Sequence, residues 1–139
     1  MFDIILAAVD GSTHSEKALE YAANLAEGHG SNLFLVHAYP HTADLRGYSD
    51  YARLIARRVK EGQVILNAAR KILGDSPLNI QEELLEGPAA DAIISVAKAR
   101  KADLIVMGTR GHGSLKGVLF GSVSNKVSHY APCTVMVVR

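Results

Sequence analysis

Residues 104–124 read L-I-V-M-G-T-R-G-H-G-S-L-K-G-V-L-F-G-S-V-S, an apolar run of strand length that opens into a glycine-rich loop. The loop carries five glycines at positions 108, 111, 113, 117 and 121. Glycine costs backbone entropy, so this density predicts a chain that turns tightly or lies close to another group. A loop that follows a buried strand and ends in Gly121-Ser122 at a helix start offers free N–H groups and a positive dipole end, which suit phosphate oxygens. The stretch therefore predicts a phosphate-binding loop at the carboxyl end of a strand in a parallel sheet.

On both sides of this loop, strand-length apolar runs alternate with segments of helical period. Strands are expected at 4–9, 33–38, 79–85, 104–107 and 134–138, and helices at 13–27, 51–73, 89–99 and from about 122. Thr13-x-x-Glu16 matches the capping-box pattern, which places the start of the first helix there. The polar stretch 40–47 is expected to be a loop. The alternation predicts an α/β fold, with a single doubly wound sheet of about five parallel strands and helices on both faces.

Length and charge narrow the class of protein. The chain has 139 residues, 48% of them hydrophobic, which is enough for one core, so residues 1–139 are expected to form one domain. The formal net charge of +1 gives no general attraction to nucleic acid, and no apolar run approaches the length of a membrane span, so neither nucleic-acid binding nor membrane insertion is expected. A lone cysteine, Cys133, and the lack of a signal-peptide pattern favour a cytoplasmic location.

Two common phosphate-binding motifs are absent. The chain has no G-x-x-x-x-G-K-[ST], which excludes the usual P-loop, and the first strand-to-helix turn, Val9-Asp10-Gly11-Ser12, lacks G-x-G-x-x-G, which disfavours a nicotinamide dinucleotide. The six histidines do not pair with Cys, Asp or Glu at spacings typical of zinc sites. No metal is expected to be held by the protein alone, and Mg²⁺ or Mn²⁺ would arrive with a nucleotide.

Four segments together resemble the ATP-binding branch of the universal stress protein family. They are the spacing Gly108-x2-Gly111-x9-Gly121-Ser122, the amino-terminal I-L-A-A-V-D-G-S, the L-V-H-A that ends the second strand, and the carboxy-terminal A-P-C-T-V-M-V-V. The likeness extends over the whole chain and is weakest from Pro40 to Ile80. It implies a single universal stress protein domain of the adenine-nucleotide alpha-hydrolase-like fold, with strand order 3-2-1-4-5. In that order the first and fourth strands end side by side.

The resemblance also implies a set of nucleotide-binding residues. Ala8, Val9 and Asp10 would line the adenosine pocket, with Asp10 reaching the ribose or a nucleotide-bound metal ion. Ala38 would offer backbone to the adenine edge, and Met107 and Gly108 would lie beside base and ribose. The remaining residues of the set would hold phosphates; they are Arg110, Gly111, Gly113, Gly121, Ser122, Val123 and Ser124. The ligand would be ATP, or ADP or AMP.

Each of these residues also has a purely structural interpretation. The glycine loop could be a flexible connection without a ligand, and Asp10 could cap the first helix together with Ser12. His37, at the end of a buried strand, is expected to be a hydrogen-bonded core or rim histidine rather than a catalytic base. Lys126, like Arg110 near it, could pair with phosphate or remain a solvated charge. Tyr48 and Tyr51 are expected to pack in the helix layer rather than cover a nucleotide.

The last strand, Thr134 to Val138, is apolar and would lie at an edge of the implied sheet. The resemblance implies a homodimer joined through that strand; a helix of the same subunit covering the edge is the alternative. The leading interpretation of function is a dimeric, nucleotide-binding module of the stress response that acts as a sensor or regulator. Two alternatives stay open, namely slow ATP hydrolysis or self-phosphorylation on Ser122 or Ser124, and a scaffold or transporter regulator that works without nucleotide. No catalytic residue is assigned.

Overall fold

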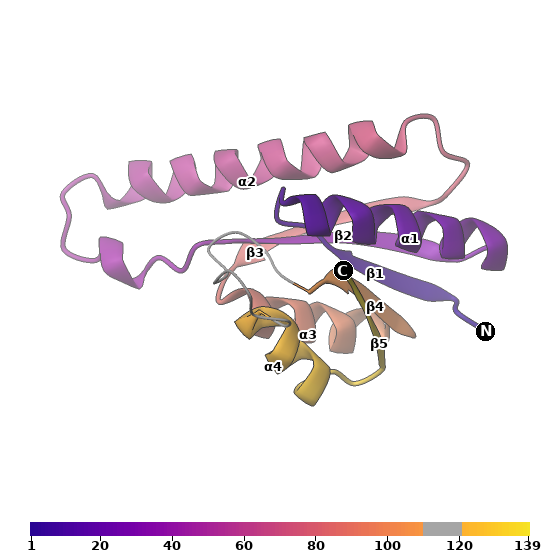
Figure 1. Ribbon diagram of the computed structural model, residues 1–139. Coiled ribbons are helices and arrows are strands. Elements are labelled where there is room, and N and C mark those ends of the chain that lie inside the picture. The colour runs from indigo at the N-terminus through magenta and orange to yellow at the C-terminus, as the bar shows by residue number, and fades with distance from the viewer. Residues whose placement is uncertain (110–120) are drawn as a thin grey trace.

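The computed structural model describes residues 1–109 and 121–139, and within them five strands alternate with helices (Figure 1). In chain order the elements are β1 (Ile4–Ala8), α1 (Thr13–His29), β2 (Asn32–Tyr39), the 3-10 helix η1 (Ala43–Leu45), α2 (Tyr51–Leu73), β3 (Ile80–Glu86), α3 (Ala89–Arg100), β4 (Leu104–Gly108), α4 (Ser122–Tyr130) and β5 (Thr134–Val138). The predicted strands and helices are all found, with ends that move by one or two residues.

The five strands form one parallel sheet in the order β3-β2-β1-β4-β5. This confirms the α/β class and the predicted order 3-2-1-4-5. In Figure 1, α1 and α2 lie over one face of the sheet, while α3 and α4 lie under the other. The chain runs from β1 outward to β3 and then returns to β4, so the order reverses between β1 and β4, which are neighbours at the centre.

The core is divided by the sheet into two layers. On the side of α1 and α2, the layer includes Ile5, Ala7, Val9, Leu35 and Val106, all buried. On the side of α3 and α4, alternate residues of the same strands take part: Leu6, Val36, Ile105 and Met107 pack with Ile93 and Val127. Because successive side chains of a strand point to opposite faces, a central strand needs apolar residues at every position. This explains the continuous apolar runs at the middle of the sheet.

The start of α1 corrects one prediction. The N-cap is Ser12, whose side-chain oxygen accepts a hydrogen bond from the Ser15 N–H at 3.2 Å. Thr13 is therefore the first residue of the helix and not its cap, so Thr13-x-x-Glu16 does not act as a capping box. The helix ends at His29, two residues beyond the predicted end, because Gly30 (φ 67°) takes the left-handed conformation and returns its N–H to the Ala26 carbonyl.

Among residues 1–109 and 121–139, no helix combines the length and apolar character that a membrane crossing requires.

Candidate functional site

The reversal of strand order brings the carboxyl ends of β1 and β4 together. Beyond the end of β1, the Val9 N–H donates to the Val36 carbonyl of β2 at 2.9 Å. Beyond the end of β4, the Thr109 N–H donates to the Val138 carbonyl of β5 at 2.8 Å. One more backbone hydrogen bond thus joins β1 to β2 and another joins β4 to β5. Beyond their last residues, the chains of β1 and β4 therefore turn away from each other. This is the place where ligands collect in doubly wound sheets.

Asp10 occupies a tight turn at the end of β1. One carboxylate oxygen, Oδ1, accepts the Ser12 N–H at 2.9 Å, and the Asp10 N–H donates to Ser15 Oγ at 3.0 Å. Asp10 is half-buried, and among the described residues no hydrogen bond to its second carboxylate oxygen is present. Ser12 is therefore the N-cap of α1, and Asp10 stabilises the preceding turn through Oδ1. The other carboxylate oxygen is the one without a partner among the described residues.

The start of α4 lies directly against the end of β4. The Gly121 N–H donates to the Thr109 carbonyl at 2.6 Å, and Ser124 Oγ donates to the same carbonyl at 2.8 Å. Gly121 is the N-cap of α4 and has no side chain to cap it, so the first N–H groups of the helix, at Ser122 and Val123, have no side-chain cap among the described residues. An uncapped start of this kind is a ready site for an anion.

The two serines at this helix start differ sharply. Ser124 is 2% exposed, and its hydroxyl is within 3.1 Å of the Gly121 carbonyl as well as bonded to Thr109, so it joins the helix to β4. Ser122 is exposed. Of the two hydroxyls considered for self-phosphorylation, the structure leaves Ser122 accessible and uses Ser124 internally.

Gly108 lies where β4 packs closely against α1, and this contact leaves no space for a side chain. A Cβ built on Gly108 would lie 2.7 Å from the Cβ of His14 and 2.9 Å from its carbonyl carbon, so β4 presses its end against the first turn of α1. Thr109 extends this contact, since its Oγ1 is 3.3 Å from His14 Nδ1. The close approach of β4 to α1 explains this glycine without any ligand.

The other predicted residues are placed around the same edge. Ala8 is half-buried and packs on the α3 and α4 side, where Met107 is 4% exposed. Ala38 is half-buried near the end of β2, opposite Leu85 of β3. Arg110, Gly111 and Gly113 lie outside the described residues.

Two further side chains near the site contact other residues of the protein, and two tyrosines are exposed. His37 is 8% exposed, with Nδ1 2.7 Å from the Val9 carbonyl, which confirms the hydrogen-bonded core histidine. Lys126 forms an ion pair with Asp91 at 2.8 Å, across α4 and α3. Tyr48 and Tyr51 are 61% and 36% exposed, so the expectation that they pack in the helix layer is wrong.

Sequence reasoning did not identify one serine and one threonine whose hydrogen bonds stabilise the site. Ser15 and Thr109 are 5% and 4% exposed: Ser15 Oγ accepts the Asp10 N–H after β1, and Thr109 Oγ1, after β4, contacts His14 Nδ1 of α1. The signal for Ser15 was its place three residues after Ser12 in D-G-S-T-H-S, the spacing of an N-cap and its N3 residue. Thr109 carried no signal, because a threonine after a buried strand is common.

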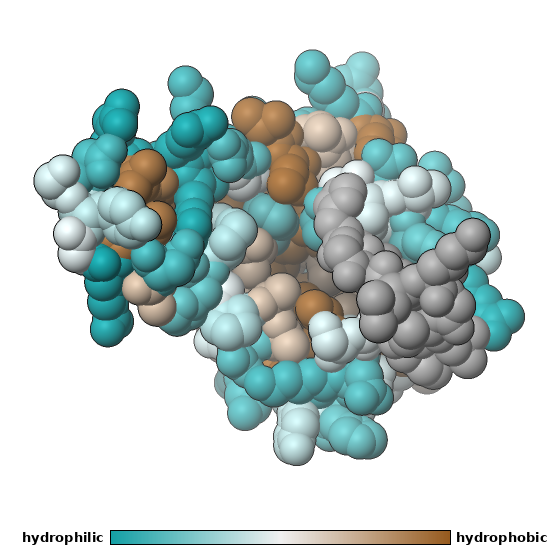
Figure 2. Space-filling model, turned by 60° about the vertical axis from the view of Figure 1, so that its left-hand side comes forward, coloured by the Kyte–Doolittle hydropathy of each residue, from teal (hydrophilic) through white to brown (hydrophobic). Residues whose placement is uncertain are grey.

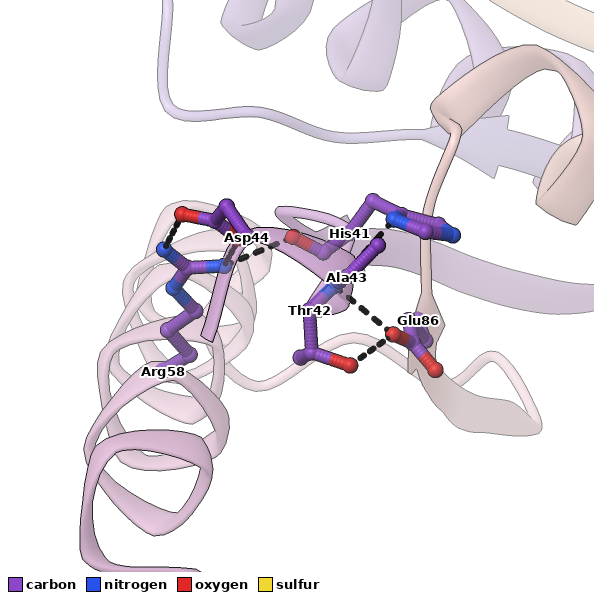
Figure 3. A network of polar contacts seen from close by, with 6 residues as sticks. All are labelled: His41, Thr42, Ala43, Asp44, Arg58 and Glu86. Carbon is purple, nitrogen blue, oxygen red and sulfur yellow. Dashed lines mark hydrogen bonds and ion pairs between the residues drawn. The ribbon is translucent and has the colours of Figure 1, made fainter. Parts of the chain in front are cut away.

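A network of polar contacts holds residues 41–45, which follow β2, in place (Figure 3). Thr42 donates both its N–H, at 2.8 Å, and its hydroxyl to Glu86 Oε1 at the end of β3. Arg58 of α2 forms a two-bond ion pair with Asp44 of η1, at 2.9 and 3.0 Å, and also donates to the His41 carbonyl at 2.7 Å. Residues 41–45 are thereby tied to the sheet and to α2 at once.

These contacts lower the pKa values of two carboxyl groups. The Thr42 hydroxyl and N–H hold the pKa of Glu86 below its ordinary value, and the hydrogen bonds from Arg58 do the same for the pKa of Asp44. Both carboxyl groups are exposed to water, so the ion pair between Arg58 and Asp44 contributes little to stability by itself. The network fixes a position rather than supplying much energy.

Figure 2 views the molecule from the side that lies at the left of Figure 1, where the strands end. The surface is hollowed near its centre, and brown and pale residues line the hollow, with polar residues along its left and lower margins. An apolar floor with polar groups at its edge suits a ligand that has both a flat ring system and charged groups.

The chain matches known proteins along its whole length. The model of the universal stress protein family matches residues 1–139. A Thermus aquaticus protein named "universal stress protein in QAH/OAS sulfhydrylase 3′region" is 39% identical over 142 residues, which cover 100% of both chains. Universal stress protein UspA from Lactobacillus plantarum superposes with a TM-score of 0.84 at 28% identity, covering 99% of this chain and 97% of that one.

A second solved structure is a universal stress protein from Archaeoglobus fulgidus in complex with dAMP. It superposes with a TM-score of 0.74 at 25% identity, covering 100% of this chain and 98% of that one. The fold, the strand order and the full-length match agree with one another, and together they place the protein in a family. This chain belongs to the universal stress protein family.

Proposed function

We propose that this chain binds an adenine nucleotide, ATP in the first place, at the carboxyl ends of β1, β2 and β4 and the start of α4. The phosphates lie at Gly121, Ser122 and Val123, and the adenosine lies toward Asp10 and Ala38. Asp10 meets the ribose or a Mg²⁺ or Mn²⁺ ion that accompanies the phosphates. Arg110, Gly111 and Gly113 join the phosphate group in this proposal.

The observation that carries the proposal is the uncapped start of α4 beside the point where strand order reverses. Gly121 supplies no capping side chain, and the Thr109 carbonyl holds it in place. Backbone N–H groups and the helix dipole at such a position favour negative charge. Asp10 follows the end of β1 at the same edge, and its second carboxylate oxygen has no hydrogen-bond partner among the described residues, so a hydroxyl or a metal ion could bind there in this proposal.

A relative supports the choice of base. The Archaeoglobus fulgidus universal stress protein was solved in complex with dAMP and matches this chain over its whole length. An adenine nucleotide is therefore the class to test first. The match of the family model from residue 1 to residue 139 supports the proposal that the chain is one universal stress protein domain.

The test is a calorimetric titration of ATP, AMP and GTP, each with Mg²⁺, into the wild-type protein and into Gly121→Val. Nucleotide carried through purification is removed first by denaturing extraction and identified. Gly121 has φ −75° and ψ 168°, an extended conformation that valine adopts without backbone strain, so the variant adds bulk at the proposed phosphate position; circular dichroism checks that it folds. We expect ATP binding in the micromolar range in the wild type and its loss in the variant.

Gly28→Val is the matched control. Gly28 is exposed near the end of α1, where a built Cβ meets nothing within 4 Å, and α1 ends at the opposite end of the strands from the site. This control should bind as the wild type does. Absence of adenine-nucleotide binding below millimolar concentration in the wild type would contradict the proposed function.

The biological role that we propose is regulatory, in a dimer of the stress response. The edge strand β5 is apolar in sequence, and Val135, Met136 and Val137 are only half-buried within the single chain. Two copies joined along β5 through a two-fold axis would bury this edge. Nucleotide occupancy would then alter the shape or the partners of that dimer.

A second candidate, slow self-phosphorylation, is favoured by one observation. Ser122 is exposed at the first position of α4, where the proposed phosphates lie, while Ser124 is buried. If the reaction occurs, Ser122 is the acceptor. A mass increase of one phosphoryl group after incubation with Mg-ATP, absent in Ser122→Ala, would demonstrate it, and an unchanged mass would exclude it.

A further inference from the structure

The peptide bond that joins Val9 to Asp10 is held from both sides by side chains. Its carbonyl oxygen, on Val9, lies 2.7 Å from His37 Nδ1 of β2. Its N–H, on Asp10, donates to Ser15 Oγ of α1 at 3.0 Å. His37 and Ser15 are 8% and 5% exposed, so both bonds are protected from water. Two elements on either side of β1 thus fix the orientation of one peptide plane.

The His37 contact defines the state of its ring. A carbonyl oxygen only accepts hydrogen bonds, so Nδ1 carries the hydrogen and the neutral ring has its lone pair on Nε2. Gly62 of α2 lies beside this ring: a Cβ built on Gly62 would lie 3.3 Å from His37 Cδ2 and 3.7 Å from Nε2, so a side chain there would crowd the imidazole. The glycine on α2 therefore leaves space for the ring in the position from which Nδ1 reaches the Val9 carbonyl.

Val9 itself offers a ligand no polar group. Its N–H is paired with the Val36 carbonyl and its carbonyl with His37, and its side chain is 5% exposed in the core layer. What this position controls is the direction in which the chain leaves β1. The next residue is Asp10, the one acidic side chain in the proposed site.

We propose that His37 and Ser15 are positioning residues, which clamp the Val9–Asp10 peptide so that the Asp10 carboxylate faces the adenine nucleotide. This inference rests on the proposed function and adds two residues that do not touch the ligand. Without the clamp, the chain after β1 has to be ordered when the nucleotide binds, and affinity falls.

The first test needs no nucleotide. Long-range ¹H–¹⁵N spectra of the imidazole rings report which nitrogen of His37 carries the hydrogen. We expect the neutral Nδ1–H form for His37, in the free protein. The Nε2–H form would mean that the bond to Val9 does not exist and would overturn the inference, whether or not nucleotide binds.

The second test compares two substitutions that separate the hydrogen bond from packing. His37→Phe keeps a ring of similar size and removes the donor, whereas His37→Asn places an amide close to the Nδ1 position and leaves a void. We expect His37→Phe to weaken AMP and Mg-ATP binding by about tenfold, the scale of one hydrogen bond. His37→Asn should recover most of the affinity, although its void makes it the less well-packed protein. The opposite order of affinities would show that the ring acts through packing alone.

A double-mutant cycle tests whether the effect passes through Asp10. In an Asp10→Asn background, His37→Phe and Ser15→Ala should each change affinity by less than twofold, against about tenfold in the wild-type background. Equal losses in both backgrounds would overturn the inference. His29→Phe, the same change on the last turn of α1, is the control and should bind normally. If the wild type binds no nucleotide, the proposed function fails with the inference; if it binds and the cycle shows no coupling, only the inference fails.

Discussion

Gly108 shows how one residue joins two elements that form the site. Its Cα faces the first turn of α1, where His14 leaves no space for a methyl group. No left-handed conformation is present at Gly108, so the glycine is required by the contact alone. The same contact sets the distance between the end of β4 and the turn that holds Asp10.

Gly108→Ala should lower the free energy of unfolding by about 1–3 kcal/mol, because backbone atoms of His14 cannot move aside as a flexible side chain could. Urea unfolding followed by circular dichroism measures the change. Gly28→Ala is the comparison, since nothing lies within 4 Å of its added methyl group and alanine favours the helix by up to about 1 kcal/mol. Equal stability of the two variants would mean that α1 adjusts freely against β4.

Sequence reasoning identified the site at the level of segments better than at the level of atoms. The turn at Asp10 and the helix start at Gly121 could be predicted, because glycine, aspartate and serine after apolar runs have strong local preferences. The hydrogen bonds of Thr109 and His37 could not, because each joins elements that are distant in sequence. The bond of Ser15 is local, since it joins residues five positions apart, and its spacing from Ser12 was a signal for it. Arg110, Gly111 and Gly113 remain predictions.

At the scale of elements, the two edge strands of the sheet differ in charge. On β3, Glu82 accepts hydrogen bonds from Arg70 at 2.8 Å and from Gln63 at 3.0 Å, and Glu83 accepts one from Arg100 at 2.7 Å. Charged groups from α2 and α3 thus cover β3 on both faces. The residues of β5, T-V-M-V-V, include no charge. Charged edges resist pairing with another sheet, so β5 is the edge that remains for a second copy.

Val137→Lys should convert the proposed dimer to a monomer, since it places a charge in the middle of the apolar edge strand. Light scattering coupled to size-exclusion chromatography gives the mass directly. Gln81→Lys places the same charge at an exposed position of β3 and should leave the oligomeric state unchanged. A wild-type mass of one chain, or a Val137→Lys mass of two, would contradict pairing through β5.

We expect the segment from His41 to Leu45 to respond to pH. The pKa values of Glu86 and Asp44 are both lowered in the folded protein, by hydrogen bonds from Thr42 and from Arg58 respectively. The positive charge on Arg46, and on His41 when it is protonated, adds to the effect at Glu86. A carboxyl group with a lowered pKa contributes to stability above its unfolded pKa, about 4.3 for Glu and 3.9 for Asp, and the contribution is lost as pH falls through the folded value.

The contacts of this segment should therefore weaken as pH falls below the usual range of Glu and Asp carboxyl groups. The amide resonance of Thr42 measures this directly, because its N–H donates to Glu86. We expect its shift to titrate with a midpoint below the usual value for glutamate. In Glu86→Gln the titration should vanish, with Thr42 remaining ordered at neutral pH through an amide oxygen. A midpoint at or above the usual value would show that the Thr42 bonds are absent in solution.

At the scale of the whole molecule, the fold followed from the sequence because of its two-layer core. Central strands that are apolar on both faces leave few arrangements, and right-handed crossovers leave one doubly wound sheet. The order of strands came from the family likeness and was confirmed by the pairing of β1 with both β2 and β4. The short helix η1 was missed, since residues 40–47 carry no apolar period and their shape depends on Glu86 and Arg58.

Ligand binding at the strand ends should stabilise the molecule as a whole, because the proposed site joins β1, β2, β4 and α4. At a Mg-ATP concentration one hundred times the dissociation constant, the free energy of unfolding should rise by about 2.7 kcal/mol. Thermal unfolding with increasing ATP measures the rise, and calorimetry supplies the dissociation constant independently. Gly121→Val should show no rise at the same concentrations. A ligand stabilises the folded chain only by binding to it. An equal rise in the free energy of unfolding of Gly121→Val would therefore mean that the nucleotide binds away from the start of α4.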